Sequence, residues 1–155
     1  MKNITLLAII AAVIFTTACS NSKKSTTAIK TSDEMGTAIT DQMKLNGSWK
    51  LTDIKNPTLT FAGLFPDKKP TLVFKLSENQ ISGNGGCNGY GGQVTIEGHN
   101  IKFSKIIHTM MACDGINGEN QYFKTLEDVT TYKLTSDTSL VLSKGDVAMM
   151  NFTRQ

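Results

Sequence analysis

Two short segments, each built around a cysteine, place the strongest constraint on how this chain can fold. Ser82 to Gly92 contains six of the chain's 13 glycines and surrounds Cys87, and Thr109 to Cys113 brings the other cysteine of the downstream half. Glycine reaches positive φ and lets another backbone approach closely. We therefore predict a folded-back loop or bulge with Cys87 near its apex, paired in space with the segment that ends at Cys113.

The first residues have the pattern of an export signal. Lys2 precedes an apolar run from Ile4 to Phe15, which is shorter than the roughly 20 residues that span a bilayer. Small residues follow and end in Ala18-Cys19, a pattern that resembles a bacterial lipobox, although Thr16 stands where Leu is usual. We predict a lipoprotein signal peptide over 1–18 and lipidation at Cys19; ordinary signal-peptidase cleavage is the alternative.

Residues 19–45 are predicted to form a flexible tether behind the lipidated cysteine. Ser20 to Lys44 holds nine Ser/Thr residues and no aromatic residue, which is too little apolar surface to offset the entropy of ordering. Its few apolar residues allow a short transient helix near 33–44. In the enterobacterial lipoproteins that this segment resembles, an Asp directly after the lipidated Cys retains the protein in the inner membrane. Ser20 follows Cys19 here, so the resemblance implies an outer-membrane lipoprotein of the cell envelope with its domain in the periplasm.

Residues 46–155 are predicted to form one domain, an antiparallel sheet with one α-helix. Short alternating segments separated by turn residues indicate seven or eight strands, and Glu119 to Val129 carries apolar residues at helical spacing. Short connections favour antiparallel pairing. From Leu45 onward there are 11 Lys/Arg and 10 Asp/Glu, a balance that argues against a nucleic-acid partner.

The two domain cysteines have four possible roles. Beyond an export boundary they are expected to pair as a Cys87–Cys113 disulfide, with two buried free thiols as the alternative. A catalytic thiol would need a base such as His108 or His99 within reach, and the signatures of thiol hydrolases are absent. The spacing of the Cys and His residues matches no usual zinc site, so we expect no metal. We also expect no catalytic residue and no cofactor.

Two further patterns leave their interpretation open. The glycine run lacks the Lys-Ser/Thr ending of a phosphate-binding loop and does not precede a helix. The adjacent pairs Met110-Met111 and Met149-Met150 would each direct one side chain inward and one outward if they lie in strands. Flexible Met side chains suit an adaptable apolar groove, and they equally suit core filling.

Taken together, the segments resemble the META domain family, which includes the heat-shock protein HslJ. The match rests on Gly47-Ser48-Trp49-Lys50-Leu51, on the stretch from Ile81 through Gly86-Cys87-Asn88-Gly89-Tyr90, on Thr109-Met110-Met111-Ala112-Cys113, and on Glu119, Phe123 and Leu126. The family-motif residues that we single out are Gly83, Gly86, Asn88, Tyr90, Thr109 and Met111.

The resemblance implies a fold of α+β class, with a curved, partly open, half-barrel-like antiparallel sheet and one α-helix. It also implies a non-enzymatic envelope lipoprotein with a binding or stabilising role linked to envelope stress. The alternative is a carrier of a lipid or small apolar ligand within the curved sheet. The expected partners are the membrane, through the lipid anchor, and an envelope protein or small apolar ligand. We expect a monomer.

Overall fold

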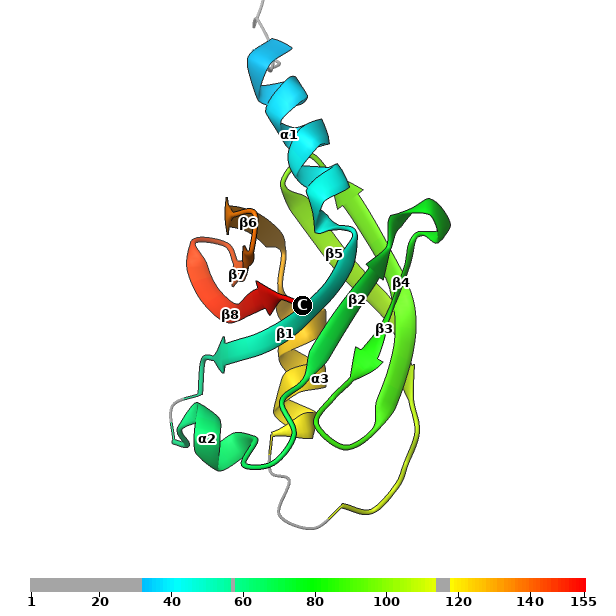
Figure 1. The fold of residues 1–155 in the computed structure, drawn as a ribbon, viewed down its shortest axis with the longest axis vertical. Helices are drawn as coiled ribbons and strands as arrows, with labels where there is room; N and C mark the ends of the chain where they lie inside the picture. Colours follow the sequence, from blue (N-terminus) through cyan, green and yellow to red (C-terminus); the bar gives the residue numbers. More distant parts are fainter. Residues whose placement is uncertain (1–31, 57, 114–117) are drawn as a thin grey trace, which may run out of the picture.

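The computed structural model describes residues 32–56, 58–113 and 118–155 (Figure 1). Eight antiparallel strands follow one another around a closed barrel, in the order of the chain. The strands are β1 (Gly47–Ile54), β2 (Thr71–Lys75), β3 (Gln80–Asn84), β4 (Gly89–Glu97), β5 (Asn100–His108), β6 (Thr131–Ser136), β7 (Ser139–Lys144) and β8 (Val147–Arg154). The predicted signal peptide and Cys19 lie outside the described residues.

The barrel has a weak seam between β5 and β6. These two strands share one register pair, Asn100↔Thr131, whereas the other neighbours pair over most of their length, including β1 with β8. The expectation of a partly open sheet is therefore corrected to a barrel that closes through this single pair. The sheet itself is curved and antiparallel as predicted, because hairpin connections let each strand pair with the next.

The expectation of one helix was wrong, since three α-helices and a 3₁₀ turn are present among the described residues. They are α1 (Ser32–Leu45), α2 (Phe61–Leu64), η1 (Leu76–Glu78) and α3 (Glu119–Asp128). Residues 32–45 thus form a helix of 14 residues rather than a flexible tether. Tertiary contacts hold its end, because Leu45 is fully buried and its carbonyl accepts a hydrogen bond from Trp49 Nε1 at 2.8 Å.

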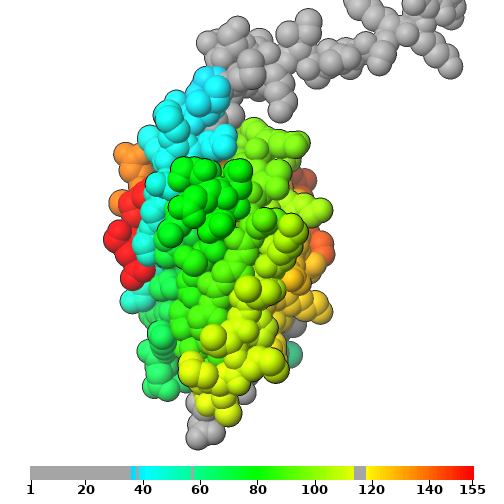
Figure 2. Space-filling model, turned by 90° about the vertical axis from the view of Figure 1, so that its right-hand side faces the viewer, coloured from blue at the N-terminus to red at the C-terminus, as the bar shows by residue number. Residues whose placement is uncertain are grey.

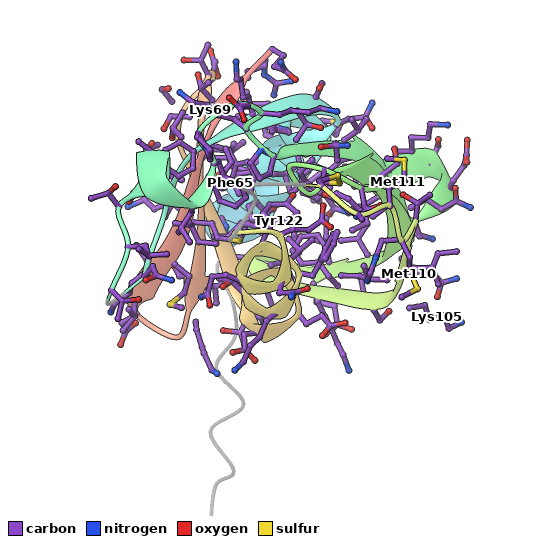
Figure 3. The ribbon with its side chains drawn as sticks, turned by 90° about the horizontal axis from the view of Figure 1, so that it is seen from below. Phe65, Lys69, Lys105, Met110, Met111 and Tyr122 are labelled. Carbon is purple, nitrogen blue, oxygen red and sulfur yellow. A yellow bond between two sulfur atoms is a disulfide. The ribbon has the colours of Figure 1, made fainter. Side chains whose placement is uncertain are left out.

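The helix predicted over 119–129 is present as α3 and contacts β5. Tyr122, Phe123 and Leu126 lie on its buried side, as the helical spacing requires. Figure 3 shows this helix end-on from below, with Tyr122 near the middle of the molecule. Gly118 precedes the helix, and residues 114–117 lie outside the described residues.

The barrel interior is filled by large apolar side chains. Trp49 is fully buried, and one continuous cluster joins inward residues of β1 to β8 with α2 and α3. The inward strand residues are Trp49, Leu51, Ile54, Leu72, Phe74, Ile81, Tyr90, Val94, Ile101, Phe103, Tyr132, Leu140, Leu142, Met150 and Phe152. Small barrels are commonly filled in this way, so the strands act as a rigid support for the loops at each end.

Candidate functional site

The loop between β3 and β4 meets the segment after β5 at the lower end of the barrel, and a disulfide joins them. Cys87 and Cys113 are bonded with their Cα atoms 6.2 Å apart, within the usual range for a disulfide. This confirms the predicted pair. Because both sulfurs are used in the bond, neither cysteine is a free nucleophile here, and the alternative of buried free thiols is wrong.

Asn88 is the centre of the hydrogen bonds that fix these two segments to each other. Its side chain is 4% exposed. Its Oδ1 accepts from Thr109 Oγ1 at 2.7 Å and from the Met111 backbone N–H at 2.8 Å, while its Nδ2 donates to the Met111 carbonyl at 3.2 Å. A buried amide with all its partners present stabilises one arrangement of the surrounding backbone.

Glu119, the first residue of α3, completes this network, which we call the Asn88 hub. Its Oε1 accepts from Asn88 Nδ2 at 2.6 Å, and its Oε2 accepts from the backbone N–H groups of Asn88 at 2.6 Å and Cys87 at 3.0 Å. Burial by itself would raise the pKa of Glu119, but these hydrogen bonds and the charge of His108 outweigh it and lower the pKa. The carboxylate is therefore held in its ionised form.

Two glycines of the motif have a clear steric reason. A Cβ at Gly83 would lie 2.0 Å from the Thr71 carbonyl oxygen of the neighbouring strand, which is an impossible contact. Gly86 has a φ of +115°, a backbone conformation that favours glycine, and it packs against the Phe65 ring. Gly83 thus lets β3 lie close against β2, and Gly86 lets the chain turn beside Cys87.

Tyr90 faces the barrel interior and pairs with Tyr122 of α3. Their hydroxyls are 2.7 Å apart and lie 3.0 Å and 3.2 Å from the Thr71 carbonyl oxygen, respectively. Burial is the main cause that raises the pKa of both phenols above the ordinary value. Both stay neutral at physiological pH and fasten α3 to β2 and β4.

Met110 and Met111 do not follow the predicted strand alternation. They lie after β5 rather than within it, and both side chains are exposed, at 92% and 60%. Ile107, near the end of β5, is 75% exposed. We call these three side chains the Met110 surface. By contrast, Met150 is fully buried and Met149 packs partly against the core, so the core-filling interpretation holds for that pair.

Figure 3 shows Met110 and Met111 on one side of the molecule, together with Lys105. The hub and the disulfide hold the backbone directly beneath these side chains. The disulfide and the Asn88 hub therefore fix a short segment whose apolar side chains face solvent.

The two histidines lie at the two ends of β5. His99 lies in the turn between β4 and β5, and His108 ends β5, where its ring stacks on Phe123 with the ring centroids 4.6 Å apart.

Among the described residues, no group of three or more His, Cys, Asp or Glu side chains is arranged to hold a metal. No helix in the described part of the chain is long and apolar enough to cross a membrane.

Sequence reasoning placed Asn88, Thr109 and Met111 in one motif, and the structure brings them into contact. It missed the contacts of Glu119, which was named only as part of the predicted helix and of the family resemblance, and those of Tyr122, which lies within the predicted helix. No spacing rule signals either role, because each depends on where α3 lies relative to the β3–β4 loop.

The fold and the hub define a small antiparallel barrel whose glycine-rich loop is held by a disulfide and a buried asparagine. The sequence model of the META domain matches residues 41–155, which is well over half of the chain. The chain belongs to the META domain family.

Solved structures with the same fold are distant in sequence. An NMR structure of a protein from Burkholderia xenovorans is 21% identical and has a TM-score of 0.59, covering 76% of this chain and 88% of that one. A crystal structure of a DUF4847 family protein from Bacteroides vulgatus is 14% identical, with a TM-score of 0.53 and coverage of 75% and 97%. The search of curated proteins found no match.

Proposed function

We propose that this chain is a non-enzymatic lipoprotein of the cell envelope whose META domain binds another envelope component. In this proposal Cys19 carries the lipid, the outer membrane is the anchoring membrane and the domain works in the periplasm. A role in envelope stress is the one that the family resemblance favours.

The observation that carries the proposal is the exposed Met110 surface on a rigid backbone. Exposed apolar side chains on a mobile loop would need no explanation, because isolated ones are common. Here three of them lie within five residues, and the disulfide and the Asn88 hub hold the segment. A preordered apolar surface loses little entropy on binding, which is what an interaction site requires.

The carrier function has less support. A carrier of a lipid or small apolar ligand would need space inside the barrel, and the inward positions of all eight strands are filled by side chains that form one packed cluster. The conformational rigidity of a filled barrel suits an interaction module better.

The proposal is tested by removing the apolar side chains from the surface. The double variant Met110→Ser, Met111→Ser should unfold at the same urea concentration as the wild type, because neither side chain is in the core. It should fail to restore survival under envelope stress in a strain lacking the gene.

The control is Val147→Ser, which removes another exposed apolar side chain, 45% exposed, at the start of β8 and away from the Met110 surface. It should restore survival fully. Full complementation by the double Met variant, at normal protein level, would contradict the proposal.

A further inference from the structure

We propose that the Met110 surface and the outer face of β3, β4 and β5 beside it bind a polypeptide segment that carries acidic residues next to an apolar side chain. This inference rests on the proposed function and specifies the partner of that same surface. Figure 2 shows this face, with β3 and β4 in green and the end of β5 and the following segment in yellow.

The charge of the face determines the charge of the partner. The outer face of β3, β4 and β5 carries two exposed lysines, Lys102 and Lys105, and one carboxylate, Glu97, which is the last residue of β4 and lies at the opposite end of that strand from Gly89. Lys105 lies two residues from Ile107 on the side where Met110 projects (Figure 3). A lysine beside an apolar surface attracts and orients an acidic group of the partner, while the apolar contacts supply most of the affinity.

The centre of the face has a shallow hollow that an apolar side chain of the partner would occupy. The register pairs Ser82↔Gly91 and Gly91↔Ile107 form a row across the outer face. The hollow is floored by Gly83, Gly89 and Gly91 and is bordered by Ser82, Ile107 and His108. Its floor is backbone, and one wall is the exposed Ile107 side chain.

The fold does not require the two β4 glycines that floor this hollow. A Cβ at Gly89 or Gly91 would meet its nearest atom at 3.8 Å or 3.7 Å, which is ordinary contact, unlike the 2.0 Å at Gly83. Glycine weakens a strand interior relative to residues with a side chain. The presence of glycine at these outward positions, next to exposed apolar groups, fits a face that a partner approaches closely.

The position of the face favours a polypeptide over the membrane to which the chain would be anchored. α1, which leads back toward the N-terminus, extends from the upper end of the barrel, and the segment after β5 lies at the lower end (Figure 1). The Met110 surface therefore faces away from the side on which the chain approaches the barrel.

The experiment uses the chain from Ser20 to Gln155 and a consensus peptide selected on it from a random-peptide display library. We expect the consensus to combine acidic residues with an aliphatic or aromatic one, and its affinity to fall with added salt. Ile107→Ser and Lys105→Glu should each weaken peptide binding several-fold.

The decisive variant is Gly91→Val, which fills the hollow. It should weaken peptide binding by about tenfold or more, while its unfolding midpoint stays equal or rises because a β-branched residue suits a strand. Thr95→Val, an exposed position further along β4, is the matched control and should bind as the wild type does. A Gly91→Val chain that binds the peptide with unchanged affinity would overturn the inference.

Vesicles containing anionic phosphatidylglycerol provide the other arm. A bilayer gains from an added apolar side chain, so vesicle binding that Gly91→Val retains or strengthens, without a selectable acidic peptide, would assign the face to a lipid surface and overturn the inference. If Met110→Ser, Met111→Ser fails to complement while no acidic peptide is selected, the proposed function stands and this partner assignment fails.

Discussion

At the scale of single residues, the side chain of Asn88 holds three segments of the chain together. Its side-chain oxygen and nitrogen join the β3–β4 loop, the segment after β5 and the first turn of α3. Serine or aspartate at this position could not supply two donors and two accepted hydrogen bonds in the same directions. The amide is what allows one residue to fix three segments.

We predict that Asn88→Ala destabilises the domain by about 2–4 kcal/mol, because it leaves several buried polar groups without partners. Urea unfolding followed by circular dichroism measures the effect. Asn151→Ala is the control, since the Asn151 side chain has no hydrogen bond within the described residues; it should change stability by less than about 0.5 kcal/mol. Equal effects of the two variants would mean that the hub adds no stability.

Glu119 makes the stability of this region depend on pH. Its pKa is lowered in the folded protein, so the carboxylate contributes stability above its unfolded pKa of about 4.3. That contribution is lost as pH falls through the lower folded pKa.

Glu119→Gln should destabilise the domain by about 1–2 kcal/mol at neutral pH, a modest value because water partly screens the carboxylate. The difference between variant and wild type should shrink as the pH is lowered from about 5 to about 3. Unfolding measurements across that range provide the test, and a difference that stays constant with pH would show that ionisation of Glu119 is not the cause.

At the scale of the elements, the disulfide and the hub act on the same two segments in different ways. The hydrogen bonds act in the folded state, whereas the disulfide acts mainly by restricting the unfolded chain. Its closed loop spans a sequence separation of 26 and contains all of β4 and β5.

Reduction of Cys87–Cys113 should lower the free energy of unfolding by about 3–3.5 kcal/mol in the chain-entropy model and leave the fold intact. Chemical denaturation with and without reductant measures the change, and far-UV circular dichroism monitors the sheet. Mass spectrometry of the unreduced, exported protein should show both cysteines protected from alkylation. Labelling of both under native, oxidising conditions would rule out the bond in the exported protein.

At the scale of the whole molecule, a filled barrel leaves its outer surface and its loops as the places for function. The barrel positions the glycine-rich loop, the Met110 surface and α3 at its lower end, while α1 leaves from the upper end (Figure 1). This division matches a domain that is held at one end and binds at the other.

Lipidation is the prediction that concerns the complete chain. Wild-type protein expressed in bacteria should incorporate labelled palmitate and fractionate with membranes, because the apolar run before Ala18-Cys19 resembles a lipobox. Cys19→Ala should abolish the label, and Cys87→Ala should keep it. Undiminished labelling and membrane association of Cys19→Ala would contradict an anchor at this residue.

The sequence alone determined the local features. Alternating apolar residues located the strands, helical spacing located α3, and glycines around Cys87 with Thr109 to Cys113 indicated the paired segments and their disulfide. These features depend on backbone periodicity and on residue type, and both can be read directly from the order of residues in the chain.

Only the tertiary structure decided that the sheet closes between β5 and β6, that 32–45 is helical, that Glu119 and Tyr122 complete the site, and that Met110 and Met111 both face solvent. Each of these depends on contacts between residues far apart in the chain, whose free energies outweigh local propensity and leave no periodic pattern in the sequence.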